Sequence, residues 1–166
     1  MGSSVNVIVG KSNLSVDGSD VGFTQGGVRI RVVKDLWERP SLKGVGISAV
    51  VKLDERFIVS TYLAEPTLTN IINAWDLNTS DLSDGGVIKK GFGGGSDVTE
   101  HTLVFTGSAP GEGKTRKVGF YKVVSCDFGD ILNSPSKPVI VPCSFEALLD
   151  ENKGHGNMVG YIRDES

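Results

Sequence analysis

Apolar residues recur with the period of a helix in one segment of the chain, residues 65–76. Four of them fall at i, i+3, i+4 and i+7 and so share one face of the predicted helix: Leu68, Ile71, Ile72 and Trp75. Pro66 suits the first helical position, where its missing N–H costs nothing. The polar residues expected to face solvent are Asn70, Asn73 and Asp76. One short amphipathic helix cannot bury its apolar face alone, so we expect it to lie on a sheet.

Most other segments alternate between apolar and polar residues with a period of two, which predicts β-strands. The predicted strands cover residues 5–9, 14–16, 26–36, 47–53, 57–63, 100–105, 114–124, 137–141 and 157–163. Turns are expected at Asp17-Gly18 and at residues 54–56, and one helical turn at residues 145–149. The predicted fold class is therefore all-β with one short helix, an antiparallel β-sandwich or partly closed barrel, in a single domain of residues 1–166.

Two segments break this alternation. Residues 37–46 contain one proline and two glycines and are predicted to form an extended loop. Residues 77–98 are polar and Gly-rich, without a lasting period, and are predicted to be a flexible loop. The 22 glycines are about twice the average share, in keeping with many tight turns.

Composition and charge narrow the function. The net charge is −3 and the isoelectric point is near 5.4, so we expect no broad basic surface that binds nucleic-acid phosphates. We expect no membrane span and no signal peptide. Cys126 and Cys143 are too few and too widely spaced for a zinc site, and are interpreted as ordinary thiols in a reducing cytoplasm.

Motifs for catalysis or cofactor binding are weak. Residues 111–115 (GEGKT) resemble the end of a phosphate-binding loop, but Lys114 opens a strand where that loop requires a helix. The chain has only two histidines, His101 and His155, and neither has a catalytic partner nearby in sequence. Three carboxylates could coordinate calcium, but they lack the spacing of a known calcium-binding loop: Asp81, Asp84 and Asp97. We therefore expect no catalytic residues, no metal and no cofactor.

The segment Trp37-Glu38-Arg39-Pro40 is the most unusual surface candidate. Tryptophan and arginine are the residues that most often anchor protein contacts, and here they flank an acidic residue at the end of a strand. The alternative is a core tryptophan that closes the sandwich. Trp75 lies on the apolar face of the helix and is expected in the core.

Three segments resemble tail tube proteins of long-tailed bacteriophages, and together with the strand order they extend the resemblance over most of the chain. They are residues 20–30 (DVGFTQGGVRI), 63–72 (LAEPTLTNII) and 142–149 (PCSFEALL). The resemblance implies a β-sandwich flanked by a helix, whose copies form hexameric rings that stack into a hollow tube. It implies a place in the virion tail, assembly in the host cytoplasm, and contacts with the tape measure, the terminator, and the baseplate or sheath. DNA passes through such a tube during ejection without specific binding.

The resemblance also suggests which residues make contacts. The family carries an extended loop between early strands that reaches the neighbouring ring, and here residues 37–46 match it. The inter-subunit contact residues are accordingly Trp37, Glu38, Arg39 and Lys43. A bore lined by carboxylates would repel DNA phosphates and keep them moving. The candidates for lining it, chosen because they flank strands, are Glu100, Asp127 and Asp130.

Other functions compete with this one. A secretion-system tube subunit or a tail terminator or completion protein would share the fold and differ in whether rings polymerise. A carbohydrate-binding β-sandwich would present several aromatic side chains on one face, whereas most aromatics here alternate as buried residues do. An enzyme would need a nucleophile, a base and a residue that orients the base, and the sequence shows no such set.

Overall fold

The computed structural model describes residues 12–41, 46–77, 79–82, 86–94, 97–111, 113–127, 129–132 and 134–165, without the side chains of residues 81, 82 and 127. The elements in chain order are β1 (Asn13–Val16), β2 (Ser19–Asp20), β3 (Thr24–Pro40), β4 (Ile47–Leu63), α1 (Leu68–Ala74), β5 (Thr79–Leu82), β6 (Lys89–Phe92), β7 (His101–Ser108), β8 (Thr115–Asp127), β9 (Val141–Ala147) and β10 (Gly160–Glu165). The fold is all-β and antiparallel with one short helix, as predicted. The predicted strand at residues 5–9 lies outside the described residues.

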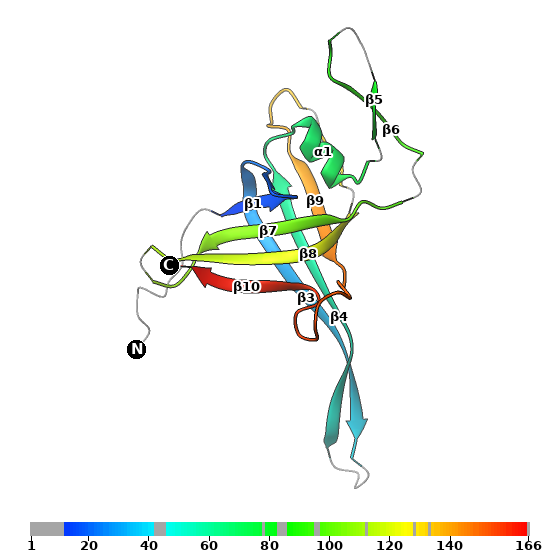
Figure 1. The fold of residues 1–166 in the computed structure, drawn as a ribbon, viewed down its shortest axis with the longest axis vertical. Coiled ribbons are helices and arrows are strands. Elements are labelled where there is room, and N and C mark those ends of the chain that lie inside the picture. Colours follow the sequence, from blue (N-terminus) through cyan, green and yellow to red (C-terminus); the bar gives the residue numbers. More distant parts are fainter. Residues whose placement is uncertain are drawn as a thin grey trace.

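Strand β8 is the junction of the main sheet. One of its edges pairs with β7, while the other pairs with β10 along its first half and with β9 near its end. From β9 the sheet continues through β4 to β3, and from β7 through β1 to β2. Strands β7, β8 and β10 cross β3 and β4 steeply (Figure 1), so the sheet folds over itself without closing into a barrel. The core fills the space between its two parts; its largest fully buried side chains are Phe145, Leu14, Leu103, Val59, Val123 and Val141.

The helix is shorter than its sequence pattern predicts. It spans Leu68–Ala74, and Thr67 caps it by accepting a hydrogen bond from the Asn70 backbone N–H. Pro66 therefore lies before the cap and not at the first helical position. Ile71 and Trp75 pack against the core as expected, but Leu68 is 44% exposed.

Asn70, predicted to face solvent, is buried. Its side-chain amide donates to the backbone oxygens of Val21, at 2.9 Å, and Glu65, at 2.8 Å. The structure thus turns this asparagine to the buried side of the helix, where these two acceptors replace the water it loses. The amide thus ties the start of the helix to the segment that follows β2.

Three predictions of local structure are wrong in the same direction, because strands continue where turns or a helix were expected. Residues 37–40 belong to β3, residues 54–56 belong to β4, and residues 145–147 belong to β9. Bulges between Asp35 and Leu36 and between Arg39 and Pro40 absorb the irregular sequence. The Gly-rich segment 77–98 also contains a hairpin, in which β5 pairs with β6.

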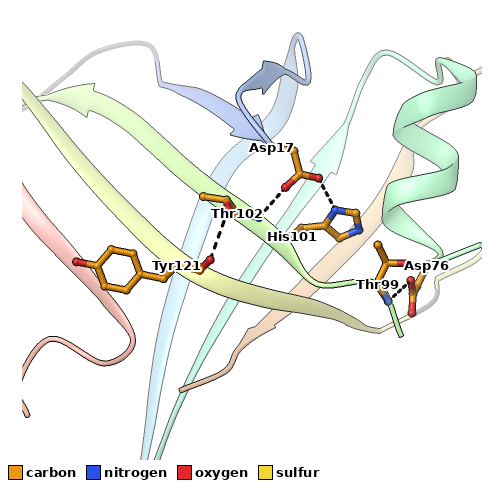
Figure 2. A network of polar contacts seen from close by, with 6 residues as sticks. All are labelled: Asp17, Asp76, Thr99, His101, Thr102 and Tyr121. Atoms are coloured by element: carbon orange, nitrogen blue, oxygen red, sulfur yellow. Dashed lines mark hydrogen bonds and ion pairs between the residues drawn. The ribbon is translucent and has the colours of Figure 1, made fainter. Parts of the chain in front are cut away.

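A polar pair between exposed Asp17 and buried His101 holds the β1–β2 turn to β7 (Figure 2). The Asp17 carboxylate lies 2.6 Å from Nδ1 of His101 and accepts the backbone N–H of Thr102 at 2.7 Å. Asp17 sits at φ 51, in the left-handed region that asparagine and aspartate tolerate best. The structure therefore supplies the partner for His101 that the sequence does not show, 84 residues away.

Replacing Asp17 with asparagine is expected to lower the free energy of unfolding by about 1–2 kcal/mol, because it removes the charge from two hydrogen bonds but keeps the left-handed backbone accessible. Denaturant melts with equal m-values would measure this loss. Asp130→Asn, an exposed position in the β8–β9 connection, is the matched control and should change stability by under about 0.5 kcal/mol. Equal losses in both variants would contradict the role given to Asp17.

Candidate assembly surface

The β3–β4 hairpin extends well beyond the rest of the molecule, on the side opposite α1 (Figure 1). We define the arm as residues 34–40 of β3 and 47–54 of β4. Every residue of the arm is exposed, whereas the inner part of β4 reaches the core at Val59 and Leu63. The arm thus has the pairing of a β-hairpin, while the other described residues leave its side chains exposed.

The arm is apolar on both of its faces. Trp37 pairs with Val51 on one face, and they are 49% and 46% exposed; on the other face Val50, next to Glu38, is 55% exposed. The other exposed large apolar residues of the arm are Leu36, Ile47 and Leu53. An isolated two-stranded hairpin is marginal in water, and a large exposed apolar patch marks an interaction site. The arm is therefore the best candidate for a protein contact surface.

Charged pairs mark the root of the arm. The Glu55 carboxylate lies 2.7 Å from Nζ of Lys52 and, across the two strands, 3.1 Å from Nζ of Lys34. These hydrogen bonds, that of Lys52 first, lower the pKa of Glu55 from its ordinary value. The Lys34–Glu55 pair bridges β3 and β4 where the hairpin leaves the body, while the Lys52–Glu55 pair lies within β4. Pairing of this kind accounts for charged residues inside a continuous strand.

The structure describes three of the four predicted contact residues. Trp37, Glu38 and Arg39 are all exposed on β3 near the end of the arm, so the structure places them on one accessible segment. They lie in a strand and not in the extended loop predicted for residues 37–46. Lys43 lies outside the described residues. The exposed apolar residues that β4 adds to the arm were not predicted, although those at 47, 50, 51 and 53 do not fit one buried face.

Open strand edges lie beside the arm. Among the described residues, the outer edge of β3 has no strand partner, and β10 pairs only on the side of β8. Pro40, which lacks a backbone donor, is tolerated at the end of such an edge strand. An unpaired edge is a template for pairing with another chain.

The predicted bore residues flank the start of β7 and the end of β8. Glu100 precedes β7, and its carboxylate lies 3.0 Å from Nζ of Lys122, which balances its charge locally and raises the pKa of Lys122. Asp130 is exposed in the connection that follows β8. The side chain of Asp127, at the end of β8, lies outside the described part of the structure.

In the Asp17–His101 pair, Nε2 of His101 is buried and has no hydrogen-bond partner among the described residues, so no substrate reaches it in this conformation. No group of three or more potential metal-binding side chains occurs within the same residues. No described helix is long and apolar enough to cross a membrane.

The two cysteines form no disulfide and differ in environment. Cys126 is exposed, while Cys143 is buried on β9, and this burial raises the pKa of the Cys143 thiol from 9.0 to about 12. Because the folded state keeps a proton that the unfolded state loses above pH 9, this thiol contributes stability below about pH 9. That stability is lost progressively as the pH rises toward 12.

Replacing Cys143 with valine is therefore expected to flatten the alkaline decline in stability. Between pH 8 and 10 the wild type should lose about 1 kcal/mol more than the variant, since one unit of pKa difference corresponds to about 1.4 kcal/mol. Denaturant melts across this range, each checked for an unchanged m-value, measure the difference. Parallel declines in the two proteins would show that Cys143 does not carry this dependence.

Comparison with models of known protein families finds no match, and neither does comparison with curated proteins. The features that bear on function are therefore the arm, the open strand edges and the sequence segments that resemble tail tube proteins.

Proposed function

We propose that the protein is a structural subunit of a bacteriophage tail tube, whose copies form hexameric rings that stack into a conduit for DNA. The observation that carries this proposal is the arm: a long hairpin, apolar on both faces, that stays exposed among the described residues. The resemblance of residues 20–30, 63–72 and 142–149 to tail tube proteins supports the same function, with the other tail proteins as further partners.

The geometry suits assembly of identical copies. Contacts between different surfaces of the same subunit are heterologous, so they close into rings when the rotation divides a circle and extend without limit when it does not. The open edges of β3 and β10 can be completed by other copies, and the arm can reach beyond its own subunit. Obligate interfaces of this kind bury roughly 2,000 Å² or more in total.

The acidic balance is compatible with a DNA conduit. Duplex DNA carries about one negative charge per 1.7 Å of its axis, so a weakly acidic bore would not retain it. The net charge is only −3 and Glu100 is paired with Lys122, so any repulsion must come from the placement of other carboxylates, such as Asp130.

The test is the state of the purified protein over a range of concentration and salt. Sedimentation velocity should show growth beyond a single ring as the concentration rises, and negative-stain electron microscopy should show tubes of constant diameter. Isolated rings that never stack would favour a terminator or completion protein, and the tube function would be wrong. A protein that stays monomeric under all conditions would overturn assembly altogether.

A further inference from the structure

We propose that an apolar groove beside the root of the arm receives the arm of a second copy of the chain. This rests on the proposed function and names the surface on which the arm docks. The groove lies between the inner part of the β3–β4 hairpin and the strands β8 and β10 with the segment that precedes β10, and its volume is about 740 Å³. Its main apolar lining residues are Ile30, Val32, Phe57, Phe120, Leu149 and Ile162.

The groove remains exposed in the single chain. Ile162 is 72% exposed, and Leu149 and Val32 are exposed as well, although all three line an apolar concavity. Phe57 and Phe120, with ring centroids 6.3 Å apart, form its floor where it meets the core. Such a surface is stabilised when another apolar surface covers it.

The charge of the groove fits an apolar occupant. Among the residues that line it, Lys52 and Glu55 form an ion pair with each other, and the other ionisable side chains are those of His155 and Tyr161. The groove thus offers little net charge to attract a strongly ionic ligand. The apolar side chains of Trp37 and Val51, which share one face of the arm, match it better.

The arm cannot fill the groove of its own subunit. Ile30, Val32 and Phe57 of the same hairpin line the groove, and the outer part of that hairpin points away from the body (Figure 1). A second copy, by contrast, supplies an arm for every groove. Because arm and groove are different surfaces, each subunit can give one contact and receive one, which is the head-to-tail arrangement that a ring or stack requires.

The contact between arm and groove is small compared with a whole subunit interface. A tryptophan presents roughly 150–250 Å² of surface, about half of it exposed at Trp37. The groove, at about 740 Å³, has the size of a small-ligand pocket, so it can receive a few side chains of the arm but not its whole length. Such a contact is one part of an interface, because stable interfaces bury roughly 1,200 Å² or more in total. The contact then adds to pairing between open strand edges, and we expect its loss to weaken assembly without unfolding the subunit.

Ile162→Glu tests the groove and Val51→Glu tests the arm on the face of Trp37, since both positions are exposed and tolerate a charge in the folded monomer. Val98→Glu, at an exposed position outside arm and groove, is the control. We expect both test variants to raise the concentration needed for assembly at least tenfold, and the control to change it less than twofold. Leu149→Arg serves as a second groove variant if circular dichroism shows that Ile162→Glu does not fold.

A photocrosslinker, p-benzoylphenylalanine placed at Trp37, locates the docking surface directly. Crosslinks between copies should fall within residues 149–162 or on the groove side of β3 and β4, and Ile162→Glu should reduce their yield. Tubes that form normally from both groove variants, or crosslinks confined to other segments, would overturn the groove while leaving the tube function intact. A wild type that never assembles and gives no crosslink would overturn both.

Discussion

Replacing Trp37 with alanine is expected to raise the concentration needed for assembly by about 10- to 100-fold and to leave the folded monomer nearly unchanged. Trp37 is about half exposed in the single chain, so truncation removes little packing within the subunit. If the arm is buried between copies, the lost apolar burial is worth roughly 1.5–3 kcal/mol for each contact. A difference of about 1.4 kcal/mol is tenfold in an equilibrium constant.

Light scattering and electron microscopy over a concentration series would measure the assembly effect, and denaturant melts of dilute protein would measure the effect on folding. Phe92→Ala is the matched control, because Phe92 is a large exposed aromatic residue in the β5–β6 hairpin, outside the arm. We expect it to assemble close to normally. Tubes from Trp37→Ala at the wild-type concentration would remove Trp37 from the contact.

The arm shows what local sequence can and cannot predict. The apolar and polar residues around Trp37 and Pro40 correctly single out an unusual segment, but proline and glycine nearby suggest a loop. The structure instead continues both strands, because cross-strand pairs such as Lys34 with Glu55 and a series of bulges accommodate the irregular residues. Cross-strand partners lie far apart in sequence, so a pattern read along one strand does not reveal them.

The partners of the buried polar residues are likewise not predictable from the local sequence pattern. The helical period identifies α1 and the burial of Trp75, but it assigns Asn70 to the surface. The acceptors for Asn70, like Asp17 for His101, come from distant segments that only the folded chain brings close. Nor does the sequence predict the groove, since its walls come from four strands and the segment that precedes β10.

Strand β10 forms one wall of the groove, and a glycine determines how closely it approaches β8. Gly160 pairs with Phe120, and a methyl group added at Gly160 would overlap the backbone carbonyl oxygen of Gly119. The same approach seats the Tyr161 ring over Gly119. Further along β10, Arg116 holds Asp164 with two hydrogen bonds of 2.6 and 2.8 Å, which lower the pKa of Asp164.

Replacing Gly160 with alanine is therefore expected to lower the free energy of unfolding by about 3 kcal/mol, because backbone atoms cannot give way as a flexible side chain can. Hydrogen exchange should show the largest loss of protection in β10 and in the facing half of β8. Gly154→Ala is the control, since a methyl group there would meet nothing within 4 Å. Gly154→Ala should retain wild-type stability, and an equally mild effect at Gly160 would show that β10 is not held this closely. In the assembled protein, Gly160→Ala should also weaken tube formation, because the groove loses the strand that carries Ile162.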